Sequence, residues 1–240
     1  MKKDKHRKRR LGRRVCVWCV RVFASIVLFS LLAVVALRFI PVYYTPLMFI
    51  RMYEGRKEGK EIKIKHSWTP IREIAQPLVL AVIASEDNRF MTHHGFDFEE
   101  IKMARDEARR GKRTRGASTI SQQTAKNVFL WPGKSYVRKA LEAYFTVLIE
   151  LIWGKERIME VYLNSIETGR GLYGAEAVAE DHFKKQAKDL TPSEAALIAA
   201  TLPNPRRFDS ANPSPYIRRR QALIMALMNK VGLIDIGYRR

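Results

Sequence analysis

The sequence predicts a mainly α-helical protein, with one folded domain behind a single membrane-spanning helix. Three observations support this prediction. An uncharged apolar run lies near the N-terminus, helical apolar periodicity continues through most of the remaining chain, and alternating strand patterns are scarce. Roughly 200 residues remain after the tail and the span, which suffices for one domain with a core and two lobes but not for a second catalytic domain.

The membrane helix is predicted from the run between Val22 and Leu37, which contains no charged residue. Extended back to Val15, the run reaches the roughly 20 residues that a bilayer span requires. Basic residues far outnumber acidic ones in residues 1–14, so the positive-inside rule places this tail in the cytoplasm and the domain outside. A cleaved signal peptide is the alternative, but the end of the run lacks the small residues of a cleavage site.

This helix sets the predicted organisation of the chain. Residues 1–14 form a basic cytoplasmic tail, 15–40 the transmembrane helix, 41–67 a membrane-proximal segment and 68–240 the folded domain. The apolar residues 47–50 are expected to lie at the membrane interface.

The formal net charge of +20 predicts an anionic partner. For a domain that faces outward at a membrane, we expect lipid headgroups or lipid-linked phosphates rather than nucleic acid. The only two cysteines, Cys16 and Cys19, have a spacing that redox and zinc sites also use. Their position in the span predicts ordinary small residues of a membrane helix.

Capping signals and apolar periodicity predict a series of helices in the domain. The predicted helices cover 74–87, 97–108, a segment starting at Ser118, 135–154, 158–166, 175–183, 191–203 and a last segment starting at Ser214. A short strand is predicted within 60–68 and a glycine-rich turn at 169–174. The basic segment 109–116 is predicted to be a loop, which could close over phosphate or remain solvated.

Two adjacent carboxylates, Glu86 and Asp87, end an apolar helix, where the helix dipole disfavours negative charge. Such a position raises the pKa of a carboxyl group, as a general base working near neutral pH requires. The alternative is an ordinary polar helix end with Arg89 as a salt-bridge partner.

A second group begins at Gly116 with the sequence G-A-S-T-I-S-Q-Q and continues to Lys126 and Asn127. Hydroxyl and amide groups at a helix start, beside a basic loop, predict an anion site that would suit phosphate. The alternative is a well-capped helix with a polar exposed face.

A third group consists of Lys134, Arg138, Lys139 and Glu142, at the edge of the apolar stripe of the longest predicted helix. A carboxylate among these cations can organise them for a ligand, hold a divalent cation such as Mg²⁺ or Mn²⁺, or form a structural salt bridge.

These three groups, in this order and spacing, resemble the peptidoglycan glycosyltransferase family, whose members polymerise lipid II. The resemblance continues through R-I-M-E-V-Y-L-N at 157–164, the glycine turn at 169–174 and L-T-P-S-E-A-A-L-I-A-A-T-L-P-N-P at 190–205. It covers nearly all of 68–240 and implies a lysozyme-like, two-lobed glycosyltransferase domain. The sequence contains no S-x-x-K motif of a penicillin-binding transpeptidase, so we expect polymerisation alone.

The resemblance implies roles for individual residues. Glu86 would be the catalytic base and Glu142 a second essential carboxylate near the donor, while Lys126 and Arg138 would contact diphosphate. Many members have an arginine where this chain has Lys134, which leaves the role of this lysine open. The other expected substrate-binding residues are Asp87, Phe90, His93, Ser118, Thr119, Gln122, Gln123, Asn127 and Lys139.

The resemblance also implies a setting. Lipid II and nascent lipid-linked glycan would be the substrates, other cell-wall synthesis or division proteins are candidate partners, and a divalent cation near Glu142 is a candidate cofactor with no organic cofactor expected. The chain would be a single-pass protein of the bacterial inner membrane with a periplasmic catalytic domain.

Two other functions are alternatives: a lytic muramidase or transglycosylase, and a non-catalytic membrane scaffold. A lytic enzyme protonates a poor leaving group and has no need of cations beside it, so the basic groups at 109–115 and 134–139 favour synthesis. A scaffold would not explain the spaced carboxylates and amides.

Overall fold

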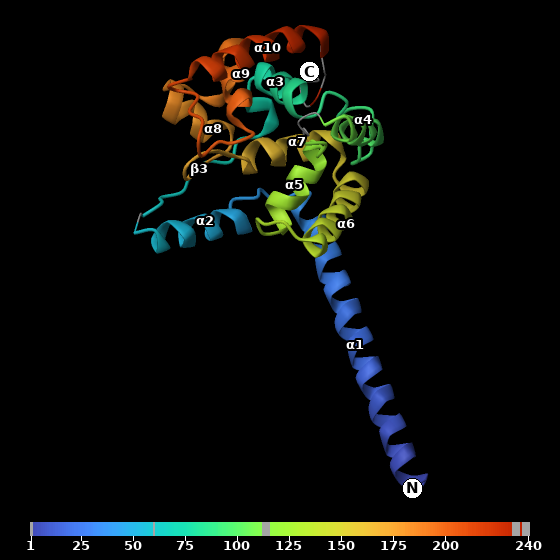
Figure 1. The fold of residues 1–240 in the computed structure, drawn as a ribbon. Helices are drawn as coiled ribbons and strands as arrows, with labels where there is room; N and C mark the ends of the chain where they lie inside the picture. The colour runs from blue at the N-terminus through green and yellow to red at the C-terminus, as the bar shows by residue number, and fades with distance from the viewer. Residues whose placement is uncertain (1, 60, 112–115, 232–235, 237–240) are drawn as a thin grey trace. The chain divides into compact units, whose positions relative to one another are not determined.

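The computed structural model describes residues 2–59, 61–111, 116–231 and 236 (Figure 1). The chain separates into two compact units, residues 1–40 and 41–240. Residues 112–115 of the expected basic loop lie outside the described residues, so the two alternatives for that loop remain predictions.

The first unit is the long helix α1 (Lys2–Leu37). Its stretch Arg13–Leu37, which has 25 residues, is long and apolar enough to cross a membrane. The predicted N-terminal helix is therefore confirmed, and it is compatible with a single-pass membrane anchor. Cys16 and Cys19 are free cysteines within this helix.

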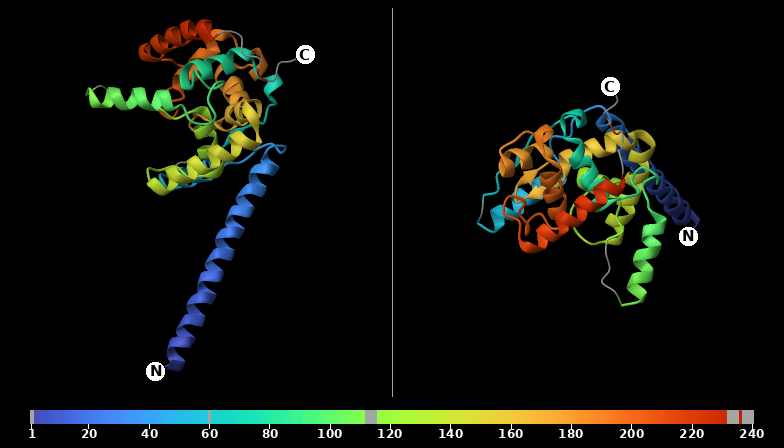
Figure 2. Two further views of the ribbon diagram at one scale, coloured as in Figure 1. Left: turned by 90° about the vertical axis from the view of Figure 1, so that its right-hand side faces the viewer. Right: turned by 90° about the horizontal axis from the view of Figure 1, so that it is seen from above.

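The second unit is mainly helical, as predicted, and in both views of Figure 2 the helix of residues 98–109 (green) projects from the other helices of the unit. Its helices are α2 (Pro46–Lys57), η1 (Ile71–Glu73), α3 (Gln76–Glu86), α4 (Phe98–Arg109), α5 (Ile120–Phe129), α6 (Tyr136–Ile152), α7 (Gly154–Ser165), α8 (Ala175–Val178), the π-helix η2 (Ala179–Phe183), η3 (Ala187–Asp189), α9 (Pro192–Thr201) and α10 (Pro215–Val231). Its strands are β1 (Lys65–His66), β2 (Glu167–Gly169) and β3 (Leu172–Tyr173).

Side-chain caps fix several of the predicted helix starts. Thr191 and Glu194 form the predicted capping box of α9, and the Ser135 hydroxyl accepts the Arg138 amide at the start of α6. For α5 the start is one residue later than predicted: Thr119, not Ser118, caps the helix. These caps satisfy backbone amides that would otherwise lack partners in the first turn.

Two groups of helices form the core of the second unit. Helix α3 packs against α9 and α10, whereas α5 packs against α6 and α7. The side chains of Leu78, Val79, Val82 and Ile83 on α3 are at most 1% exposed, and burying each contributes about 1.5–3 kcal/mol. Because α3 is apolar almost to its end, its last residue, Glu86, places a carboxylate at the edge of the apolar core.

A small sheet of order β1-β3-β2 lies beside α7 and α8, with β1 parallel and β2 antiparallel to β3. The predicted strand within 60–68 is confirmed as β1, whereas β2 and β3 were predicted only as a glycine turn. The Asn164 side chain exchanges two hydrogen bonds of 2.8 Å with the backbone of Thr69 and so fastens the chain after β1 to α7. The segment 41–67 thus contributes α2 and β1 to the second unit.

The expectation that residues 47–50 lie together at the membrane interface is wrong for Met48, which is fully buried. Helix α2 begins at Pro46 behind the cap Thr45, and it buries Met48 and Gly55 while Phe49 and Tyr53 are exposed. Of the four, Phe49 remains the exposed large side chain, so the helical period splits the apolar run.

The hairpin between β2 and β3 requires glycine at position 171. Gly171 has φ of +75°, and a Cβ there would lie 2.7 Å from the Lys63 carbonyl oxygen. We expect Gly171→Ala to destabilise the domain by about 2–4 kcal/mol, because strain and a backbone clash add. Gly59→Ala is the control: its φ is +69° but no atom lies within 4 Å. Equal shifts in melting temperature for the two variants would contradict the contribution of the clash.

Candidate active site

A cavity of about 350 Å³, here called the cleft, opens in the second unit. Its walls come from α2, α5 and the loop after it, α6, the start of β2, and the segment after α9. The lining residues are Leu47, Arg51, Gln123, Lys126, Asn127, Leu130, Trp131, Pro132, Gly133, Arg138, Ile166, Glu167, Leu202, Pro203 and Pro205. Of the residues expected from the sequence, Gln123, Lys126, Asn127 and Arg138 therefore line one cavity.

Glu86 is joined to this cleft through Gln123. The Gln123 side-chain amide donates to the Glu86 carboxylate at 3.0 Å, and the Tyr162 hydroxyl donates to the Gln123 oxygen at 3.4 Å. Burial raises the pKa of Glu86, while the Gln123 hydrogen bond and the charges of Arg220 and Lys126 lower it and offset part of that effect. The net raised pKa suits a group that takes up a proton near neutral pH.

The rate of a reaction that uses Glu86 as a base should fall as the pH drops through its raised pKa, because only the carboxylate accepts a proton. Arg220 on α10 is one of the cations that lowers this pKa. We expect Arg220→Gln to raise the pKa of Glu86 further and to move the acidic limb of the pH–rate profile to higher pH. Arg218→Gln, which removes an exposed charge from the same helix, is the control. Coincident acidic limbs for the two variants would contradict this electrostatic role.

Glu142 organises cations at the cleft. Its carboxylate is 3% exposed, accepts a 2.7 Å hydrogen bond from Arg138 Nη1 and also pairs with Lys139. Burial lowers the pKa of Lys126, Glu142 opposes that shift, and the charges of Arg138 and Lys139 add to it. Lys126, Arg138 and Lys139 repel one another at this partly buried site, so an anion that binds between them is stabilised. Diphosphate is such an anion.

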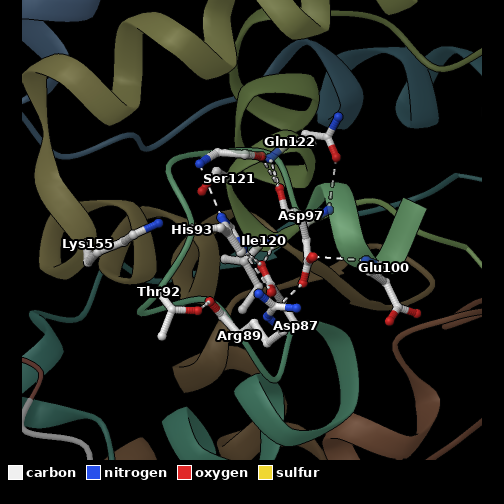
Figure 3. A network of polar contacts seen from close by, with 12 residues as sticks. Asp87, Arg89, Thr92, His93, Asp97, Glu100, Ile120, Ser121, Gln122 and Lys155 are labelled. Carbon is white, nitrogen blue, oxygen red and sulfur yellow. Dashed lines mark hydrogen bonds and ion pairs between the residues drawn. The ribbon is translucent and has the colours of Figure 1, made fainter. Parts of the chain in front are cut away.

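Asp87 is buried and belongs to the polar network shown in Figure 3. Its carboxylate receives the His93 Nε2 hydrogen at 2.9 Å and the Ile120 amide at 2.9 Å. The Gly95 amide donates to His93 Nδ1 at 3.1 Å, which fixes the hydrogen on Nε2. Asp87 therefore ties the first turn of α5 to the end of α3, and α5 carries Gln123 to Glu86.

Several expected substrate-binding residues are occupied inside the protein. Phe90 is fully buried, and Nζ of Lys155 lies 4.5 Å from the centre of its ring. The Thr119 hydroxyl donates to the Gly95 carbonyl at 2.6 Å, and Thr119 forms the capping box of α5 with Gln122. These side chains, like that of His93, are at most 8% exposed. Their contact with substrate stays a prediction, and within the structure they support the walls of the site.

The remaining expected residues are exposed. Ser118 and Lys134 lie at the surface outside the lining of the cleft, and Lys139 is half-exposed. Arg89 pairs with Asp97 at 3.6 Å and with Glu99, so the alternative that it neutralises the pair at 86 and 87 is wrong. Glu86 is thus not part of an ordinary salt bridge to this arginine.

Sequence reasoning missed four residues at or near the site: Arg51, Tyr162, Glu167 and Arg220. Tyr162 lies within the R-I-M-E-V-Y-L-N segment, so the resemblance drew attention to its segment but not to its hydroxyl. The other three are charged residues on elements far along the chain from Glu86. No local spacing indicated that Arg51 and Glu167 would line the cleft or that Arg220 would lie near Glu86.

The surroundings of Glu142 do not fit a divalent-cation centre by themselves. Both of its oxygens pair with cationic side chains, Arg138 and Lys139, and the described part of the chain holds no cluster of three His, Cys, Asp or Glu side chains suited to a metal. Hard divalent cations take several oxygen ligands, and at this position the neighbours are donors.

The site combines a carboxylate whose pKa is raised with two cations that line a cavity beside it. This combination is suited to an enzyme that transfers a group from a donor with an anionic leaving group.

Residues 55–229 match the family model described as Transglycosylase. Three relatives are named biosynthetic peptidoglycan transglycosylase. The one from Bacteroides thetaiotaomicron is 59% identical over 84% of this chain and 82% of its own length. The one from Bdellovibrio bacteriovorus is 51% identical over 87% and 83%, and one from Xanthomonas campestris is 48% identical over 93% and 91%. The chain belongs to the transglycosylase family, and its domain is lysozyme-like.

Proposed function

We propose that this chain polymerises lipid II into glycan strands and releases undecaprenyl diphosphate during cell-wall synthesis. It is a peptidoglycan glycosyltransferase, as its family and its similarity to biosynthetic transglycosylases support. The observation that carries the substrate assignment is that Glu86 is hydrogen-bonded to Gln123, which lines the same cleft as the cations Lys126 and Arg138.

The reaction joins two lipid-linked sugars. Glu86 takes the proton from the 4-hydroxyl of the acceptor N-acetylglucosamine as this oxygen attacks the anomeric carbon of the donor. The bond from that carbon to the diphosphate oxygen breaks on the opposite face, so the configuration inverts. Lys126 and Arg138 stabilise the charge that develops on the departing diphosphate.

The lytic alternative is not favoured. A raised carboxyl pKa would serve a general acid as well as a general base, so Glu86 alone does not separate the two functions. Hydrolysis of a glycosidic bond requires protonation of a poor leaving group, which nearby cations such as Lys126 and Arg138 would oppose. An anionic leaving group requires those cations.

The setting of the reaction completes the proposal. The helix Arg13–Leu37 anchors the chain in the bacterial inner membrane with a cytoplasmic N-terminus, a membrane-proximal segment at 41–67 and a periplasmic catalytic domain at 68–240. Other cell-wall synthesis or division proteins are the expected partners of such an enzyme.

The function is tested with the full chain in detergent and labelled lipid II. We expect glycan polymer and undecaprenyl diphosphate to form together. In a parallel incubation, mature peptidoglycan should remain intact. Release of soluble muropeptides from peptidoglycan, without polymer from lipid II, would overturn the proposal in favour of the lytic alternative.

A further inference from the structure

Helix α2 contributes a cation to the cleft. Arg51 lines the cavity together with Lys126 and Arg138, and its side chain is 20% exposed. Arg51 precedes residue 55, where the match to the family model begins. The part of the chain that the family model matches therefore does not include this arginine.

Arg51 and Arg138 are each paired with a glutamate about one turn later on the same helix. Nη1 of Arg51 donates to Glu54 at 2.7 Å, and Nη1 of Arg138 donates to Glu142 at 2.7 Å. Nε of each arginine is buried and makes no hydrogen bond within the described chain, although Nε of Arg51 is ion-paired with Glu167 at 3.4 Å. Each guanidinium keeps further N–H donors for a ligand. Arg51 is thus prepared for an anion in the way that Arg138 is.

A second carboxylate holds Arg51 from another side. Glu167, at the start of β2, also lines the cleft, and its carboxylate lies 3.4 Å from Arg51 Nε as an ion pair. Glu54 in turn lies 3.8 Å from Arg206, so the two carboxylates are shared between two arginines. Lys126 and Arg138 add positive charge to the same cavity, which leaves it with a surplus of cations.

We propose that Arg51 is a substrate-positioning residue that binds the diphosphate of the lipid-linked substrate together with Lys126 and Arg138. Leu47, one turn earlier on α2, also lines the cleft, so the helix presents an apolar side chain and then a cation. The junction of a prenyl chain and a diphosphate has the same order of chemistry. The proposal rests on the proposed function and extends the diphosphate site to α2, whose Arg51 lies before the residues that the family model matches.

The test measures binding of undecaprenyl diphosphate to the full chain in detergent by titration calorimetry, which requires no turnover. We expect Arg51→Gln to weaken binding about tenfold, because a charge-assisted hydrogen bond is lost. Arg51→Lys should fall between, since lysine keeps the charge but not the fork. Arg56→Gln removes an exposed charge from the same helix and should bind as the unmodified chain does.

A purely structural role for Arg51, bracing α2 against β2, predicts a different pattern. Glu54→Gln keeps an acceptor for Arg51 but removes a negative charge, so the proposal expects equal or tighter binding of undecaprenyl diphosphate. Lower melting temperatures for Arg51→Gln and Glu54→Gln, with diphosphate affinity unchanged in both, would overturn it. So would a loss of turnover on lipid II in Arg51→Gln without weaker diphosphate binding, because Arg51 would then contact another anion of the substrate, such as a peptide carboxylate.

This result is separable from that of the proposed function. A chain that binds undecaprenyl diphosphate through Arg51 but makes no glycan from lipid II would contradict the polymerase proposal and support the binding site. If the unmodified chain polymerised lipid II but Arg51→Gln bound undecaprenyl diphosphate as tightly as before, the polymerase proposal would be supported and the proposed role of Arg51 contradicted.

Discussion

Replacing Glu86 with glutamine is expected to reduce glycan polymerisation from lipid II about 10³-fold, because general-base catalysis is lost. Glutamine has nearly the same shape and can still accept from Gln123, which holds the native carboxylate at 3.0 Å. The folded domain should therefore persist. The measurement is the initial rate of polymer formation at saturating lipid II, with the melting temperature recorded for each protein.

Glu73→Gln is a matched control for this variant, since it removes one exposed carboxylate from the same region of the chain. It should polymerise at the unmodified rate. A Glu86→Gln protein that kept more than a tenth of the activity would show that another group accepts the proton. The base would then have to be sought elsewhere, although the polymerase function itself would stand.

Glu142→Gln should have the second largest effect, on both rate and stability. The Glu142 carboxylate is nearly inaccessible and pairs with Arg138 and Lys139, so its loss leaves cations without their counter-charge. Breaking such a buried pair typically destabilises a protein by about 3–5 kcal/mol. We expect a melting temperature lower by several degrees and, at a temperature where the variant is folded, at least a hundredfold slower turnover because Arg138 is no longer held at the diphosphate.

Lys139→Gln separates these two contributions. Its ammonium is 49% exposed and pairs with the same carboxylate, but an exposed ion pair contributes only about 0–1 kcal/mol. This variant should retain its stability and most of its activity. If it were as impaired as Glu142→Gln, Lys139 rather than Arg138 would be the cation that Glu142 holds for the reaction.

The helical framework could be predicted because its signals are local. Thr191 and Glu194 lie three residues apart and specify the start of α9 without any tertiary information. Strands β2 and β3, with three and two residues, are too short to show an alternating pattern. Helix α2 has the start signal Thr45-Pro46, but its apolar residues were interpreted as membrane contacts, and burial of Met48 depends on packing that only the folded chain shows.

The site was predictable where its residues follow one another on neighbouring helices. Gln123, Lys126 and Arg138 belong to α5 and α6, and the order of the motifs indicated that they would meet Glu86. The turn of Asp87 toward the Ile120 amide could not be predicted, because adjacent carboxylates give no sign of which one faces inward. For Arg51 and Arg220, which join the site by long-range packing of α2 and α10, the sequence held no local signal.

The lining of the cleft extends from Leu47 to Pro205, and this spread has a consequence for the time at which the enzyme becomes competent. A ribosome that has completed α6 has already made Glu86 and Arg138, but it has not yet produced the segment after α9. A chain that ends before Leu202 lacks one wall of the cleft, whatever the order in which its helices fold. The nascent protein therefore has no finished binding site until most of the domain has been synthesised.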